Sequence, residues 1–206
     1  MKDMRMLTGK ALRLPLFLCV LFLLTASGLS AAGTGEREGG EIPGLKAEPT
    51  GGEDFGYLEL FEGLHITGTP VDIDIETFRL TIDGNVENAL ELSVAEIKSM
   101  PSERREITLV CPGFFVDRGY WTGVPLKDLL DKAGVEPDAG SVAFIEEGGG
   151  YRSILDLNRA TADGVMVAYH FNDEDFHRVH GYPLRIVADG VDGNVWVKWL
   201  GTIWVQ

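Results

Sequence analysis

The most constraining feature of the sequence is a short alternating segment that ends in a cysteine and is followed at once by a Pro-Gly pair. Ile107, Leu109 and Cys111 recur at every second position, which is the period of a β-strand with one buried face. Pro112-Gly113 then interrupts strand pairing, because proline has no N–H to donate and glycine adopts unusual backbone angles. We therefore predict a strand over 106–111 that places a thiol at its end, followed by a loop.

Cys111 is one of two cysteines in the chain, and the other, Cys19, lies in an apolar N-terminal run. If that run is removed, no partner remains for an intramolecular disulfide. The residues leave three roles open for Cys111: a small buried hydrophobe, a metal ligand or nucleophile, and one half of an intermolecular disulfide. The residue pattern by itself favours packing.

The first 32 residues have the order of a secretory signal. The segment 14–24 is almost wholly apolar, small residues follow it, and basic residues precede it: Lys2, Arg5, Lys10 and Arg13. We predict cleavage near Ala31 or Ala32 and an exported protein, periplasmic or extracellular. An uncleaved N-terminal anchor is the alternative, in which only this segment touches a membrane, although the apolar run is marginal for spanning.

Residues 33–54 are rich in glycine and glutamate and hold few large apolar side chains, so we predict a flexible linker there. The globular domain is predicted over 55–206. The net charge of -14 lacks the basic footprint of nucleic-acid binding and disfavours docking on anionic lipid.

Short strands alternate with short helices, which predicts a mixed α/β (α+β) domain. Ser93 and Glu96 have the spacing of a capping box, and Gly134 follows an amphipathic segment as helix-ending glycines do. The predicted helices cover 94–100, 126–133 and a short segment within 154–160. Strands are predicted over 78–84, 90–92, 141–145, 165–169, 184–188 and from 195 to 200, and the loop after Cys111 is predicted to carry Trp121 to the second helix.

A second group of polar residues lies among glycines near the C-terminus. His180 and Arg185 stand on either side of Pro183, and Gly193 and Lys198 follow. The planar guanidinium pairs well with phosphate, and lysine adds a point charge. Without further information a structural role is favoured: a capped turn histidine and an arginine paired with one of many carboxylates. The sequence contains no Gly-rich phosphate loop, zinc spacing or hydrolase elbow.

The order of motifs from about residue 69 to the C-terminus resembles the oxidoreductase molybdopterin-binding domain, the sulfite-oxidase-like family. This resemblance implies a sulfite-oxidase-like fold of several small mixed sheets with short helices. The residues that carry it are 78–84 with Val86, 92–93 with Ile97, Cys111 with 121–126 and 129–130, 168–169 with Asn172, 180–187, Gly193 and 197–200.

In that family a cysteine thiolate ligates molybdenum beside the dithiolene of a pyranopterin, so the resemblance makes Cys111 the catalytic metal ligand. A thiolate suits this role because it is a soft, electron-donating ligand. The resemblance also implies a set of cofactor-binding residues around the pterin and its phosphate: His65, Glu146, His180, Arg185, Gly193 and Lys198.

The sequence departs from the family pattern in three places. Sulfite oxidases have an oxyanion-binding arginine shortly after the ligand cysteine, whereas Phe114, Phe115 and Val116 stand here, so sulfite is not the expected substrate. Val195 and Trp196 replace a basic and a small polar residue. The N-terminal segment has no twin-arginine pair, although molybdopterin enzymes are normally exported folded.

The resemblance implies an exported molybdopterin-dependent oxidoreductase that performs two-electron chemistry on a small molecule. Oxygen-atom transfer or reduction of an S- or N-oxide is the expected reaction. Electrons would pass to or from a separate haem or quinone partner, because the chain has no haem or iron–sulfur motif. The alternative is a non-catalytic binding or interaction module that keeps the fold without the cofactor.

Overall fold

The structure, a computed structural model, describes residues 59–206. The predicted signal (1–32), the predicted linker (33–54) and the first four residues of the predicted domain lie outside the described residues. Within 59–206 no helix has the length and apolar character needed to cross a membrane.

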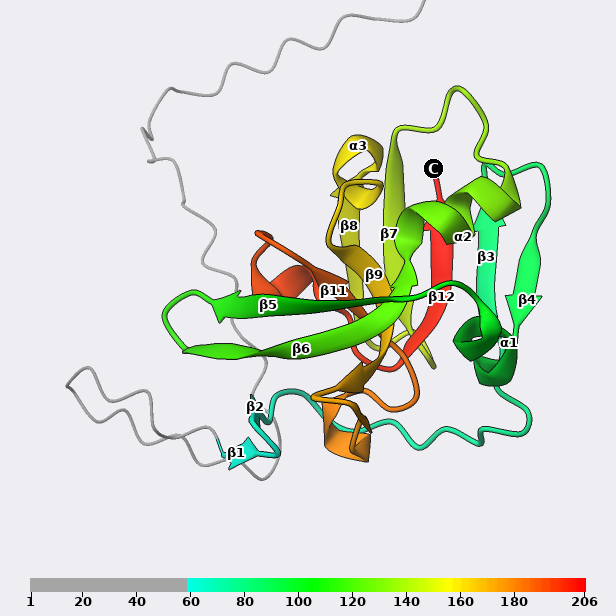
Figure 1. The fold of residues 1–206 in the computed structure, drawn as a ribbon. Coiled ribbons are helices and arrows are strands. Elements are labelled where there is room, and N and C mark those ends of the chain that lie inside the picture. The colour runs from blue at the N-terminus through cyan, green and yellow to red at the C-terminus, as the bar shows by residue number, and fades with distance from the viewer. Residues whose placement is uncertain (1–58) are drawn as a thin grey trace, which may run out of the picture. The chain divides into compact units, whose positions relative to one another are not determined.

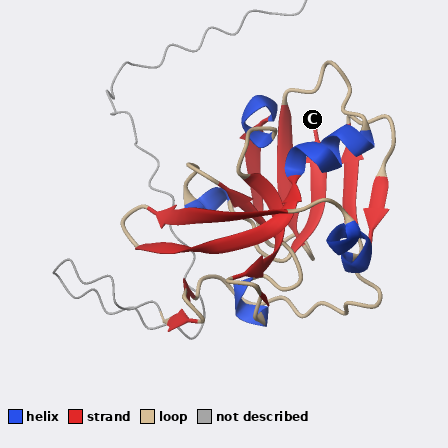
Figure 2. Ribbon diagram, in the orientation of Figure 1, coloured by secondary structure: helices blue, strands red, loops and turns tan. Residues whose placement is uncertain are grey.

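The described residues form two five-stranded sheets with a few short helices around them (Figures 1 and 2). All pairings in the first sheet are antiparallel, in the order β10-β9-β6-β5, with β11 also paired to β9. Its strands are β5 (Glu103–Cys111), β6 (Phe115–Pro125), β9 (Val165–Phe171), β10 (Glu174–Asp175) and β11 (Arg185–Ala188).

The second sheet has the order β4-β3-β12-β7-β8, and only the β3–β12 pairing is parallel. Its strands are β3 (Leu80–Gly84), β4 (Leu90–Leu92), β7 (Ser141–Glu146), β8 (Arg152–Asp156) and β12 (Leu200–Val205). A separate small pair is formed by β1 (Leu60–Phe61) and β2 (Leu64–His65). The helices are α1 (Val94–Ser99), α2 (Leu126–Ala133), α3 (Leu157–Ala160) and the 3₁₀ turns η1 (Arg178–His180) and η2 (Gly193–Val195).

The predicted class, mixed sheets with short helices, is confirmed. Helix α2 contacts β6 and β9 of the first sheet and β3 of the second, so its buried leucine stripe joins the two sheets in one core. It ends at Gly134 with a left-handed φ of 71°, as predicted. The capping box of Ser93 and Glu96 begins α1, also as predicted.

The predicted loop after Cys111 is wrong, because the chain turns at once and returns as the eleven-residue strand β6. In Figure 1 the β5–β6 hairpin runs crosswise to the strands of the second sheet. The inward positions of β6 include Asp117, Gly119, Trp121 and Gly123, all buried. A carboxylate and two glycines therefore stand where a strand pattern expects apolar side chains, which conceals the alternation.

Two further predictions of local structure are wrong in part. The segment 152–156 is the edge strand β8, and only the residues after Asp156, which caps α3, are helical. The segment 195–199 is not a strand, because the chain passes through η2 and reverses at Trp199, whose φ is +49°. Short apolar runs fit both helix and strand, so periodicity alone does not separate them.

Candidate functional site

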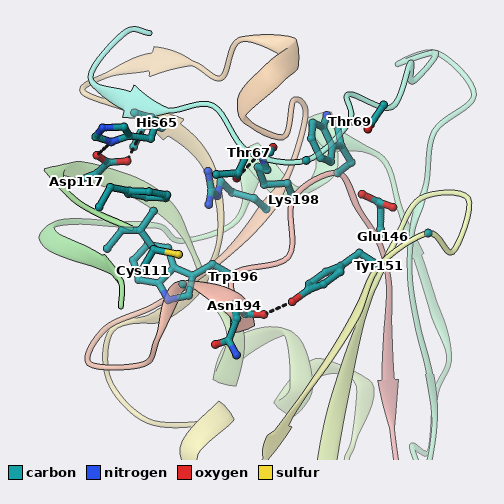
Figure 3. Close-up of a pocket in the computed structure, with 18 residues that line it drawn as sticks. His65, Thr67, Thr69, Cys111, Asp117, Glu146, Tyr151, Asn194, Trp196 and Lys198 are labelled. Carbon is teal, nitrogen blue, oxygen red and sulfur yellow. Dashed lines mark hydrogen bonds and ion pairs between the residues drawn. The ribbon is translucent and has the colours of Figure 1, made fainter. Parts of the chain in front are cut away.

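Six of the seven residues predicted for the site line one cavity of about 520 Å³. The cavity lies where the segment after β2, the β5–β6 hairpin, the end of β7, β11 and η2 come together (Figure 3). The six residues are His65, Cys111, Glu146, Arg185, Gly193 and Lys198. Their roles remain predictions, but the fold gathers them from elements far apart in the sequence.

Cys111 ends β5 opposite Phe115, the first residue of β6, and its side chain is partly buried. Burial raises the pKa of the thiol above its usual range, and the nearby carboxylates of Asp192 and Asp117 raise it further. The free side chain is therefore a neutral thiol at neutral pH. A bound metal cation would reverse this balance, because metal binding releases the proton and stabilises the thiolate.

Arg185 on β11 is 5% exposed and lines the same cavity. One of its terminal nitrogens, Nη1, donates to the carbonyl of His180 at 3.0 Å, and the guanidinium lies over the ring of Trp121 at 5.2 Å. Its Nε is buried and has no hydrogen-bond partner within residues 59–206. Burial lowers the pKa of Arg185 to about 10. A buried donor without a partner is costly, so this nitrogen marks a place for a ligand acceptor.

Lys198 lies just before β12, and its ammonium donates to the Thr67 carbonyl, the Thr67 hydroxyl at 3.1 Å and the Val179 carbonyl at 3.2 Å. Its pKa is lowered to about 7, mainly by burial and in addition by the charge of Arg185, whereas Glu146 opposes the shift. Within the described residues neither Lys198 nor Arg185 forms an ion pair with a carboxylate. Two such cations favour an anionic ligand in the cavity.

Gly193 brings the backbone of η2 against β5. A Cβ at this position would meet a Leu109 methyl group at 2.8 Å and the Val110 carbonyl oxygen at 3.2 Å, so a larger residue beside Cys111 would require the Leu109 side chain to move. Glu146 ends β7, and Figure 3 shows it with Tyr151 across the cavity from Cys111. Burial raises the pKa of Glu146.

His180 is the predicted residue that the structure does not bring to this cavity. It lines a neighbouring cavity, where its Nε2 donates to the Phe61 carbonyl at 2.8 Å and its buried Nδ1 has no partner among residues 59–206. Burial lowers the pKa of His180 to about 4, so the imidazole is neutral. It reaches the site only through its own carbonyl, which accepts from Arg185.

The cavity also contains residues that the sequence did not point out, above all Asp117, Tyr151 and Trp196. Tyr151 donates its hydroxyl to the Asn194 carbonyl at 2.6 Å, and Trp196 donates its ring N–H to the Val191 carbonyl at 2.9 Å. Asp117 is 3% exposed and accepts from His65. The alternation of 107, 109 and 111, continued beyond the Pro-Gly turn, would have marked 117 as an inward carboxylate.

The described part of the chain holds no group of three or more His, Cys, Asp or Glu side chains arranged to bind a metal ion. A metal held here would therefore need most of its ligands from a cofactor. One thiol, two unpaired cations and a glycine-lined wall suit such a ligand better than a bare ion.

Comparison with known proteins gives the family of the chain. The model of the "Oxidoreductase molybdopterin binding domain" matches residues 66–206. Sulfite oxidase of Arabidopsis thaliana is 29% identical over 182 residues, covering 71% of this chain and 46% of that protein. "Uncharacterized oxidoreductase YuiH" of Bacillus subtilis is 30% identical over 141 residues, covering 68% of this chain and 71% of that protein. This chain thus spans less than half of the sulfite oxidase.

Among solved structures, the sulfane dehydrogenase SoxCD of Paracoccus pantotrophus superposes with a TM-score of 0.63 at 24% identity, covering 66% of this chain and 40% of that one. This likeness shows that the two share a fold, the sulfite-oxidase-like fold expected from the motif order. By the family match and the shared fold, the chain belongs to the oxidoreductase molybdopterin binding domain family.

Proposed function

We propose that this chain is a molybdopterin-dependent oxidoreductase that performs two-electron chemistry on a small molecule, with Cys111 as the molybdenum ligand. The observation that supports the proposal most strongly is the cavity in which this thiol meets Arg185 and Lys198, two cations without an ion-pair partner among residues 59–206. A family match alone would leave open whether the chain keeps a usable site.

The residues present fit the family's cofactor. Its phosphate would find Arg185 and Lys198, and the orphaned Nε of Arg185 would gain an acceptor. Gly193 brings the backbone of η2 close to Cys111, with room for a side chain only if Leu109 moves. When bound, the cofactor would supply a molybdenum centre that exchanges two electrons together with an oxygen atom.

The chain's own residues would bind and orient this group and exclude water. Cys111 would give up its thiol proton to become the ligand. Trp196, 3% exposed and stacked edge-on against Trp121 at 5.4 Å, closes one wall. Phe115 lies opposite Cys111 across the hairpin. The thiol therefore has aromatic side chains among its neighbours in the cavity.

We propose a neutral S- or N-oxide as the substrate, in preference to sulfite or nitrate. The aromatic residues beside Cys111 replace the oxyanion-binding arginine expected of a sulfite oxidase. The cations that line the cavity, Arg185 and Lys198, are assigned to the cofactor in this proposal, and the carboxylates of Asp117 and Glu146 disfavour a second anion.

This preference is tested on protein purified from its native host. Reduced methyl viologen serves as electron donor for dimethyl sulfoxide, trimethylamine N-oxide or nitrate, and ferricyanide serves as acceptor for sulfite. We expect kcat/KM for the better oxide to exceed those for nitrate and sulfite by about 10-fold or more. Faster turnover of sulfite or nitrate contradicts the proposal.

We further propose that the protein is exported and exchanges electrons with a separate haem or quinone partner. The order of residues in 1–32 supports export, and the missing haem and iron–sulfur motifs support a separate partner. The intact mass of the native protein tests export: loss of the first 31 or 32 residues is expected. A full-length chain in the cytoplasm contradicts it, and a full-length chain in the membrane fraction indicates the anchor.

One observation favours the alternative, a binding module without cofactor. The family resemblance leads us to expect a small polar residue at Trp196, and the Trp196 side chain instead donates to the Val191 carbonyl and packs against Trp121. Molybdenum bound to the native protein would support the oxidoreductase, and native protein without molybdenum would support the binding module.

A further inference from the structure

Asp117 is the one buried carboxylate among residues 59–206, and both of its oxygens form hydrogen bonds with His65. The backbone N–H of His65 donates to Oδ2 at 2.9 Å, and the ring Nδ1 of His65 lies 2.6 Å from Oδ1 (Figure 3). Burying a carboxylate is unfavourable unless it is paired and hydrogen-bonded. The contact therefore joins β2 to the first residues of β6.

The contact also sets the protonation of the ring. An ionised carboxylate only accepts hydrogen bonds, so Nδ1 carries the proton and Nε2 is left for other uses. Nε2 has no hydrogen-bond partner in the described part of the chain, and the side chain is 21% exposed. The ring stacks on Phe115 at 4.6 Å with an interplanar angle of 21°. Phe115 pairs with Cys111 across the hairpin, so the imidazole stacks on the residue opposite the thiol and lines the same cavity.

We propose that His65 is the proton carrier of the cavity, used through Nε2, and that Asp117 is the positioning residue that holds it in the Nδ1–H form. The inference rests on the proposed function. Reduction of an S-oxide takes up two electrons and two protons and releases the sulfide and water. The electrons come from the reduced haem or quinol partner. His65 passes one proton from solvent through Nε2 to the departing oxygen, and solvent supplies the other proton.

The other titratable groups of the cavity are less suited to this role. All three donor contacts of Lys198 go to Thr67 and Val179, and Arg185, with a pKa of about 10, holds its proton too firmly. The hydroxyl of Tyr151 already donates to Asn194. The groups that line the cavity with His65 are Cys111, Asp117, Glu146, Tyr151, Arg185 and Lys198.

A purely structural role for the pair predicts different results. If Asp117 serves only to join β6 to β2, its substitution changes the free energy of unfolding but leaves the His65 tautomer and the proton transfer unchanged. The first test therefore needs no cofactor. In the full chain labelled with ¹⁵N, the shifts of the four imidazoles report which ring nitrogen carries the proton, and His65→Gln assigns the signal of His65.

Asp117→Asn is the informative variant, because an amide has one acceptor oxygen where the carboxylate has two. If the backbone N–H of His65 keeps that oxygen, the amide NH₂ faces Nδ1 and favours the Nε2–H form. Asp138→Asn is the matched control, because Asp138 is an exposed carboxylate in the turn before β7 that does not line the cavity and makes no contact with His65. We expect the tautomer to change in Asp117→Asn only. An unchanged tautomer overturns the positioning role.

The second test measures dimethyl sulfoxide reduction with reduced methyl viologen at equal molybdenum content. We expect Asp117→Asn and His65→Gln each to lower kcat by about 10-fold or more with little change in KM, and the double variant to be no worse than either. Asp138→Asn should keep the wild-type kcat. Unchanged kcat in His65→Gln overturns the proton-carrier role, and this variant decides the matter if Asp117→Asn fails to fold. A molybdenum-loaded wild type without oxide reduction overturns the proposed substrate, while the tautomer still decides the positioning role.

Discussion

On one side of the cavity a negative charge is disfavoured, and elsewhere in it two positive charges are disfavoured. Burial and two carboxylates disfavour the thiolate of Cys111, whereas burial disfavours the positive charges of Arg185 and Lys198. A ligand with a metal cation at one end and an anionic group at the other relieves both. Without a ligand, the charged form of each of these three residues is unfavourable. Binding of the family's cofactor would stabilise all three charged forms.

Cys111→Ser is expected to abolish molybdenum-dependent turnover while changing stability by about 1 kcal/mol or less, because the side chain is only partly buried and serine has nearly the same shape. Activity, metal content and urea unfolding measure the outcome. Val110→Ser, on the opposite and exposed side of the same strand, is the control. A large loss of stability with no activity to lose would instead show that the thiol serves packing.

Lys198 gives the cofactor-free protein a pH-dependent stability with a defined sign. Its folded-state pKa of about 7 lies below the unfolded value of about 10.4, so between these pH values the unfolded chain binds one proton more. The free energy of unfolding therefore rises with pH from about 7 to about 10, and this contribution is constant below that window.

Lys198→Met should remove this rise, whereas Lys132→Met, at an exposed position on α2, should keep it. Urea unfolding at a series of pH values measures the difference between wild type and variant. Inorganic phosphate should weaken the rise in the wild type, because a bound anion favours charged Lys198. A difference between wild type and Lys198→Met that does not change with pH contradicts the buried-cation description.

At the scale of elements, strand β6 depends on glycines at inward positions. A Cβ at Gly123 would lie 2.3 Å from the Val167 carbonyl oxygen on β9, and one at Gly119 would lie 2.3 Å from the Phe171 ring. The first neighbour is backbone of the paired strand and has no room to move, whereas the second is a side chain. These glycines let β6 and β9 approach closely, and β6 carries Phe115 and Asp117 to the cavity.

Gly123→Ala should therefore destabilise the protein by about 2 kcal/mol or more, and Gly119→Ala by less. Gly140→Ala is the matched control, because a Cβ there meets no atom within 4 Å and its φ is not positive. Thermal and urea unfolding give the three values. Equal stability of Gly123→Ala and Gly140→Ala would show that the strands separate easily and that the close approach is not required.

At the scale of the whole molecule, local patterns predicted the elements and not their pairing. The helices α1 and α2 were predicted because a capping box, a leucine stripe and a terminal glycine are local signals. The parallel pairing of β3 with β12 joins strands more than a hundred residues apart, and no local pattern encodes it. Strand β6 was missed because its buried face is built from Asp117, Gly119 and Gly123.

The residues of the candidate site were likewise predicted only in part. Cys111, Arg185, Gly193 and Lys198 were predicted because they lie within motifs whose order resembles the family, and the fold brings them to one cavity. Asp117 was missed because its importance comes from His65, which lies 52 positions away. His180 sits in the same motif as Arg185, yet its ring turns to the Phe61 carbonyl in a neighbouring cavity.

The function proposed for this chain requires that its cavity hold a molybdenum cofactor in the living cell. Its most direct test is the molybdenum content and pterin fluorescence of the protein isolated from its native host, with Cys111→Ser from the same host beside it. We predict molybdenum and pterin in equimolar amount with the wild-type chain and loss of metal in the variant. A native wild-type protein free of both molybdenum and pterin would contradict the claim and leave the fold as a binding module.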